Sequence, residues 1–174
     1  MKKLPSKSKT KGKTFEREVA NYLSKLYNNS FTRVPDSGAF TGGKNAFRRE
    51  TLTEGQVRAH KGDIIPPDDW KYLNIECKNY ADFPFHNLLS TGNIPILEDW
   101  IQQTLQAADP GDCNTLIFRI TRKGTFIATQ LPNNFTVNRH LDYTDKASNV
   151  WRISNMIEFF ELNADTFAER NKAI

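Results

Sequence analysis

The stretch Gly62–Lys78 constrains the fold of this chain more than any other, because it has the pattern of two short strands around a tight turn. The apolar pair Ile64-Ile65 precedes Pro-Pro-Asp-Asp, a run of residues typical of turns. A second strand-like segment, Tyr72–Cys77, follows the turn. The sequence therefore predicts a hairpin in this region.

Charged side chains fall on one face of this predicted hairpin. Residues two apart in a strand share a face, so Glu76 and Lys78 point to one side, and Ile75 and Cys77 point to the other, towards the core. Folding back about the turn brings Asp63 close to Glu76. Two converging carboxylates suit a hard divalent cation, and a lysine beside them can hold or activate a water. The alternative is an exposed hairpin with ordinary surface charges.

A helix is predicted over residues 14–27, and two acids lie near its start. Its apolar stripe consists of Phe15, Val19, Tyr22, Leu23, Leu26 and Tyr27. At about 100° per residue, Glu16 lies close to this stripe and Glu18 lies on the solvent side. A carboxylate that faces inward near other carboxylates needs a cation or a partner. The alternative is that both acids only favour the first helical turn.

A strand at Phe31–Val34, a turn and a glycine-rich loop come next, followed by a basic segment at about 39–61. We expect this basic segment to engage DNA, with Phe40 and Phe47 placed to wedge against bases. The alternative is a solvated loop. Its candidate DNA-binding residues are Lys44, Arg48, Arg49, Arg58 and Lys61.

Taken together, these short motifs resemble the PD-(D/E)xK nuclease superfamily, and their order is similar to that of archaeal-type and phage Holliday-junction resolvases. The match covers residues 11–80. One departure is the long segment between the serine-glycine loop and the aspartate. The matching motifs are Lys11-Gly12, Glu16-Arg17-Glu18-Val19, Arg33, Ser37-Gly38, Gly62-Asp63 and Ile75-Glu76-Cys77-Lys78.

The resemblance implies an α/β, restriction-endonuclease-like core with a central mixed β-sheet flanked by helices. If the carboxylates of Glu16, Asp63 and Glu76 converge, they form an all-oxygen site that selects Mg²⁺ or Mn²⁺ over zinc. The resemblance adds the backbone carbonyl of Cys77 as a metal ligand. It also implies that Ser37 and Arg33 contact the scissile phosphate. The catalytic set is Glu16, Asp63, Glu76, Lys78 and Ser37.

Charge is unevenly distributed along the 174 residues. Residues 1–61 contain 14 Lys and Arg against 5 Asp and Glu, whereas the rest contains 10 against 15. A basic front half suits a polyanion such as DNA, and Lys11 and Lys13 join the candidate DNA-binding residues. The alternative is a lysine-rich tail that only keeps the chain soluble. We expect residues 1–13 to form a basic flexible arm and residues 14–174 a single nuclease domain.

Other features point to an intracellular protein. No apolar run is long enough to span a membrane, and no secretory signal is recognisable. Cys77 and Cys113 are too few for a disulfide framework. We expect a cytoplasmic location, in the host cytoplasm if the protein is viral.

The second half predicts the remainder of an α/β sandwich. Pro95 opens a helix that ends before Pro110-Gly111, and strands at 115–121 and 125–130 form a hairpin. Residues 132–149 read as a loop. Residues 150–162 fit either a strand or a helix. A last helix is expected at 164–172, with Asn163 as its N-cap.

The sequence is compatible with three functions. The first is a metal-dependent Holliday-junction resolvase, acting as a homodimer because a two-fold substrate suits a two-fold protein. The second is another PD-(D/E)xK DNA endonuclease, restriction-like or engaged in repair or recombination, that cuts duplex, flap or branched ends. The third is a DNA-binding module without catalysis. The complete set of three acids and one lysine disfavours the third.

Overall fold

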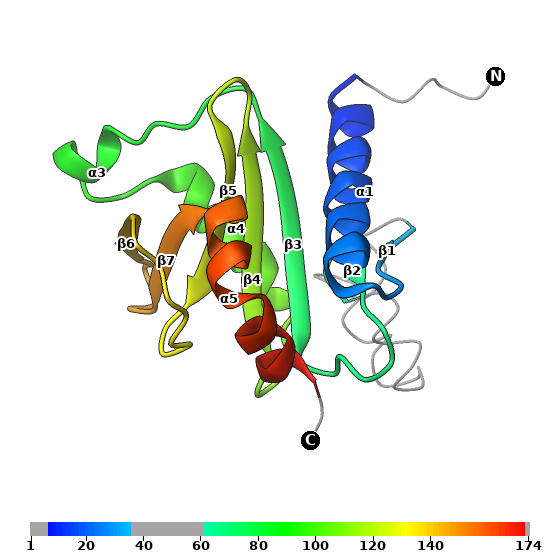
Figure 1. Cartoon of the computed structure of the whole chain (residues 1–174). Coiled ribbons are helices and arrows are strands. Elements are labelled where there is room, and N and C mark those ends of the chain that lie inside the picture. The colour runs from blue at the N-terminus through cyan, green and yellow to red at the C-terminus, as the bar shows by residue number, and fades with distance from the viewer. Residues whose placement is uncertain (1–6, 36–60, 173–174) are drawn as a thin grey trace.

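A five-stranded mixed sheet forms the centre of the protein (Figure 1). The computed structural model describes residues 7–35 and 61–172. The strand order is β3-β4-β5-β7-β6, with β3 and β4 parallel and the other neighbours antiparallel. The five strands are β3 (Leu73–Tyr80), β4 (Cys113–Ile120), β5 (Gly124–Gln130), β6 (His140–Thr144) and β7 (Val150–Asn155).

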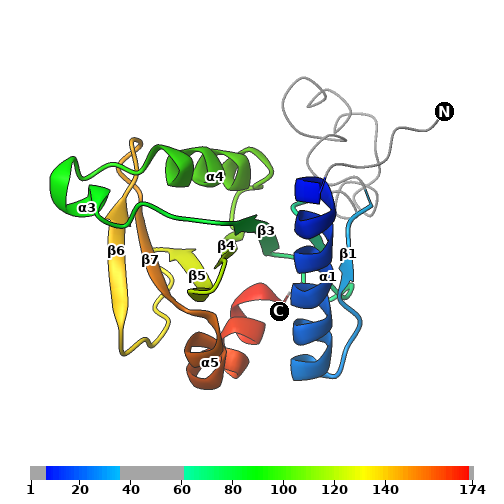
Figure 2. The same cartoon turned by 90° about the horizontal axis from the view of Figure 1, so that it is seen from above.

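Helices cover both faces and one edge of this sheet (Figure 2). The connection between the parallel strands β3 and β4 contains the short α3 (Asn87–Ser90) and then α4 (Pro95–Gln106), which packs on one face. The opposite face is covered by α5 (Met156–Asn171), and α1 (Lys7–Tyr27) runs beside β3. The predicted α/β fold with a central mixed sheet flanked by helices is confirmed. No helix in the described ranges has both the length and the apolarity that a bilayer requires.

Two apolar layers hold the helices on the sheet. On one side, Ile75, Ile117 and Ile127 pack with residues of α1 and α5. On the other side, Leu116 and Phe118 pack under α4. Successive side chains of β4 enter opposite layers because a strand has a period of two, and both layers are apolar because both faces of the sheet are buried. The central strands are thus a rigid base for the side chains at their edges.

The predicted hairpin is only partly correct. The pair Ile64–Ile65 forms β2, which pairs antiparallel with β1 (Thr32–Arg33) and not with β3. Contact with β3 is made instead by Asp63, whose N–H donates to the Ile75 carbonyl at 2.8 Å. The Asp63 carbonyl in turn accepts from the Val34 N–H at 2.9 Å. The chain therefore brings Asp63 beside Glu76, as expected. It does so because the single residue Asp63 bridges Val34 and β3, and not because two strands pair as a hairpin.

The N-terminal helix is longer than predicted. Residues 7–13, which we expected in the flexible arm, are the first turns of α1. Adding residues to an existing helix is much easier than nucleating one, and Phe15, Val19 and Leu23 anchor the rest of α1 in the core. Residues 1–6 of the expected arm and most of the basic insertion at 39–61 lie outside the described residues.

The C-terminal part also differs from the prediction. The helix α5 begins at Met156, and its N-cap is Asn155, whose side chain accepts from the backbone N–H groups of Ile157 and Glu158. Asn163 lies inside α5, where its side chain bonds to the backbone of Thr136. The segment 132–149, predicted as a loop, contains β6.

A glycine is required where the chain meets β3. Gly62 has a φ of +61°, and a Cβ atom there would lie 2.5 Å from the backbone oxygen of Ile75. Both the left-handed conformation and the close approach exclude a side chain. Gly62 therefore allows Asp63 to reach the strand.

We predict that Gly62→Ala destabilises the protein strongly. Gly92→Ala is a matched control, because Gly92 has a φ of +70° but no atom within 4 Å of an added Cβ. The left-handed conformation alone costs roughly 1–2 kcal/mol, and the clash at Gly62 adds about 1–3 kcal/mol. Urea unfolding of both variants measures the difference. An equal loss in the free energy of unfolding for the two variants would show that the clash at position 62 is relieved without cost.

Candidate active site

A groove of about 780 Å³ runs between the first turns of α1 and the outer edge of β3. It is rich in lysine along α1. Among the described strands, β4 is the only one that pairs with β3 along its length, so the other edge of β3 faces the groove. The charged and aromatic lining residues are Lys7, Lys9, Lys11, Lys13, Glu16, Arg33, Lys78 and Tyr80.

Asp63 is fixed against this edge of β3. Its Oδ2 accepts a hydrogen bond from the backbone N–H of Cys77 at 2.7 Å. In a strand, the N–H and C=O of one residue point to the same edge. The Cys77 carbonyl therefore points to the side on which the Asp63 carboxylate lies, while the Cys77 side chain is buried in the core.

Glu76 and Lys78 share a face of β3, as the sequence predicted. The Lys78 Nζ donates to the Glu76 Oε1 at 2.6 Å and also to the Oε1 of Gln103 in α4. Glu76 is buried, with 9% of its surface exposed. The lysine is thus held between a carboxylate on its own strand and an amide on the covering helix.

The two acids of α1 take different environments. The Glu16 side chain is only 12% exposed and forms an ion pair with Arg33 of β1. The Glu18 side chain is 48% exposed and pairs with Arg119 at 2.5 Å. Glu16 therefore faces the interior near the other carboxylates, and Glu18 lies at the surface.

The carboxylates influence one another. Burial raises the pKa of Glu76 to about 7, and the nearby Asp63 adds to this shift against the opposing effect of Lys78. Burial also raises the pKa of Glu16, again reinforced by Asp63 and opposed by Arg33. The three carboxylates thus share one electrostatic site, in which two cationic side chains face three acids.

This donor set fits a hard divalent cation. Within residues 7–35 and 61–172, no group of three His, Cys, Asp or Glu side chains already stands in a metal-holding arrangement. Two of the acids are instead paired with basic side chains, Glu16 with Arg33 and Glu76 with Lys78. The available donors are carboxylate oxygens and the Cys77 carbonyl, which suit Mg²⁺ or Mn²⁺. A bound cation would replace the two ion pairs and relieve the repulsion among the acids.

The other predicted site residues have different outcomes. Arg33, Lys11 and Lys13 line the groove. Lys61 does not, because it is 4% exposed and forms ion pairs with Asp112 and, at 3.3 Å, Asp109. The predicted DNA contact of Lys61 is therefore wrong: this lysine anchors the chain just before Asp63. The predicted residues Ser37, Lys44, Arg48, Arg49 and Arg58 lie outside the described residues.

Gln103 was not predicted as a site residue. The sequence shows a polar face on α4 with Gln102, Gln103 and Gln106. Nothing in the sequence distinguishes the glutamine that reaches β3, because the packing angle of α4 on the sheet decides it.

Comparison with known proteins identifies the family. No curated protein and no solved structure matches the chain. The family described as "Phage putative PDDEXK endonuclease" matches residues 7–173, which include α1, the Asp63 bridge, β3 and every later element. The chain belongs to this family of PD-(D/E)xK endonucleases.

Proposed function

We propose that the protein is a divalent-metal-dependent endonuclease that hydrolyses phosphodiester bonds of DNA in the groove beside β3. The observation that carries this proposal is the meeting of Glu16, Asp63, Glu76 and Lys78 at one place. They come from three separate segments of the chain: the charge of Asp63 acts on both Glu16 and Glu76, Lys78 pairs with Glu76, and Glu16 and Lys78 line a lysine-rich groove.

Each side chain has a role that follows from its position. Glu16, Asp63, Glu76 and the Cys77 carbonyl would hold Mg²⁺ or Mn²⁺, which would supply an activated water and neutralise charge on the phosphate. Lys78, released from Glu76, donates hydrogen bonds to the attacking water and to the phosphoryl oxygens as negative charge develops.

Three further residues have supporting roles, two on the phosphate and one on Lys78. Arg33, released from Glu16, is placed at the groove to contact the scissile phosphate, and we assign the same task to Ser37. Gln103 keeps the Lys78 ammonium directed at the site, because its Oε1 accepts from Nζ.

The groove accounts for DNA binding. Lys7, Lys9, Lys11 and Lys13 line it from α1. Neutralising phosphates with lysine releases counterions and gives affinity without sequence preference. We extend this surface to Lys44, Arg48, Arg49 and Arg58 of the insertion.

The substrate distinguishes two forms of the proposal. A Holliday-junction resolvase acting as a homodimer would nick a four-way junction symmetrically near the branch. Another PD-(D/E)xK nuclease would cut linear duplex or flap DNA. Incubation with a synthetic junction, a flap and a linear duplex, each with and without Mg²⁺, separates the two. Binding without any metal-dependent cutting of these DNAs would contradict both and indicate a non-catalytic module.

Asp63→Asn and Glu76→Gln should each lower the cleavage rate on the order of 10³-fold. DNA binding should persist or tighten, because a carboxylate that repels phosphate is removed. Cleavage assays and anisotropy titrations with labelled DNA measure the two effects. Glu16→Gln should lose activity as well, whereas Glu18→Gln, two residues along the same helix, should cleave normally. Near-normal cleavage by Asp63→Asn or Glu76→Gln would refute the assigned site.

Gln103→Ala should lower kcat about 10-fold with little change in KM, because the lysine loses its orienting partner but DNA contacts remain. Gln102→Ala is the matched control, since Gln102 is an exposed neighbour on the same helix. Steady-state cleavage of one DNA substrate measures both variants. Equal kcat values for the two variants would show that Lys78 needs no support from α4.

Replacing Lys11 and Lys13 together by Gln should weaken DNA binding and reduce its dependence on salt. Each lost phosphate contact lowers the slope of log K against log salt by about 0.9. Titrations at several NaCl concentrations give the slope. Lys25→Gln, at the far end of α1, should leave it unchanged. An unaltered slope in the double variant would place the DNA elsewhere.

A further inference from the structure

The edge strand β6 lies across the sheet from the candidate active site (Figure 1). In the described part of the chain, β7 is the only strand that pairs with it. His140, Leu141, Asp142 and Thr144 are all exposed. The strand contains no lysine or proline, the residues that often protect a sheet edge from further pairing.

The hydrogen-bond pattern shows which backbone groups of β6 face outward. The Val150 carbonyl accepts from the Leu131 N–H, on the side of β5. The backbone N–H and C=O groups of successive residues point to opposite edges of a strand. The groups of Trp151 and Ile153 in β7 therefore point to β6. Their partners in β6 are Tyr143 and Leu141. The N–H and C=O groups of the remaining residues of β6 therefore point to the open edge.

These groups allow self-pairing about a two-fold axis at Leu141. In that antiparallel register, Leu141 lies opposite the partner's Leu141, and His140 lies opposite the partner's Asp142. Hydrogen bonds then join His140 to the partner's Asp142 in both directions. A register centred on Asp142 would instead place the two Asp142 carboxylates, each already bound by Arg152 at 2.7 Å, opposite each other and would place Leu141 opposite the partner's Tyr143, so that the two leucines would no longer face each other.

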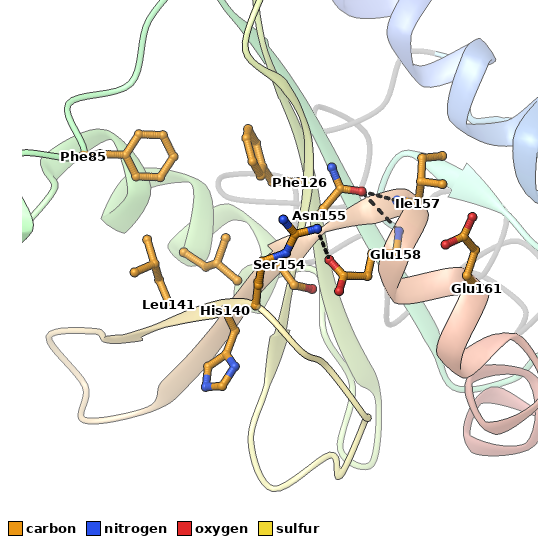
Figure 3. Close-up of a pocket in the computed structure, with 11 residues that line it drawn as sticks. Phe85, Phe126, His140, Leu141, Ser154, Asn155, Ile157, Glu158 and Glu161 are labelled. Atoms are coloured by element: carbon orange, nitrogen blue, oxygen red, sulfur yellow. Dashed lines mark hydrogen bonds and ion pairs between the residues drawn. The ribbon is translucent and has the colours of Figure 1, made fainter.

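A partly apolar surface adjoins this edge. Leu141 is 45% exposed and lies at a pocket of about 560 Å³ (Figure 3). Phe85, Phe126 and Ile153 also line this pocket. Opposed Leu141 side chains would bury each other beside this apolar lining, so that side-chain burial accompanies the backbone pairing.

We propose that the protein forms a homodimer by antiparallel pairing of β6 with β6 of a second copy, centred on Leu141. The proposal specifies the surface for the homodimer included in the proposed function. It does not depend on the cleavage chemistry, because assembly is measured without metal or DNA. Since β3 and β6 are opposite edges of one sheet, both grooves remain open in the dimer.

Light scattering after gel filtration tests the association. The wild-type chain should have the mass of a dimer, and Leu141→Lys should have that of a monomer while retaining the wild-type circular dichroism spectrum. Leu26→Lys is the control, because Leu26 is 38% exposed on α1, away from β6 (Figure 2). A monomeric wild-type protein, or a dimer that Leu141→Lys leaves intact, would overturn the proposal. A monomeric wild type would also leave the edge for a strand of a different protein.

Engineered cysteines test the register. Facing residues in this position have Cα atoms about 4.5–5.5 Å apart, within the range for a disulfide. The natural Cys77 and Cys113 are buried. Under mild oxidation, Leu141→Cys should cross-link to a covalent dimer. His140→Cys and Asp142→Cys should cross-link when mixed, but not each alone. Cross-linking of Asp142→Cys alone, or none by Leu141→Cys, would refute the register.

Discussion

The candidate site depends on one contact, the bridge between Asp63 and the outer edge of β3. The Asp63 N–H bonds to the Ile75 carbonyl, and its carboxylate accepts from the Cys77 N–H. Gly62 makes this approach possible, because its backbone passes where no side chain fits. Lys61, which precedes Gly62, is buried and forms an ion pair with Asp112, and this contact anchors the chain just before the bridge. Backbone hydrogen bonds therefore fix the position of Asp63 on β3, and its carboxylate reaches the site without depending on a flexible side chain.

The acids of the candidate site are only partly balanced by basic side chains of the protein itself. Three carboxylates lie together, and burial raises the pKa of both Glu16 and Glu76. Arg33 and Lys78 compensate two of these acids. Both basic side chains are also the groups best suited to contact phosphate. A divalent cation would therefore do two things at once: it would stabilise the acids and release the bases for the substrate.

Local periodicity was sufficient to predict much of this site. The period of two in a strand placed Glu76 and Lys78 on one face, and the helical angle of 100° per residue placed Glu16 inward and Glu18 outward. The paired strands β4 and β5 were also predicted, because a turn separates two apolar segments. These features depend on residues close together in the sequence.

The missed features depend on contacts between distant residues. The two-residue strand β2 pairs with β1, more than 25 residues earlier, and no pattern within β2 specifies its partner. Apolar residues of β7 and of the start of α5 follow one another directly, and Trp151, Ile153, Phe159 and Phe160 are all buried, so periodicity could not show where the strand ends and the helix begins. Asn155 and Asn163 are equally good caps by residue type, and only the point where β7 ends selects the first. Lys61 looked like a DNA contact until its buried partners were known.

The two edges of the sheet would allow one fold to combine the proposed cleavage with the proposed assembly. A central strand pairs on both sides, so a metal ligand from its backbone would be lost to a neighbour. In the described part of the chain, no strand pairs along the outer side of β3, so the Cys77 carbonyl there is not taken up by a neighbouring strand. Any further strand added to β3 would occupy this carbonyl and close the groove. Extension of the sheet by a second copy would therefore be compatible with the proposed catalysis at β6 and not at β3.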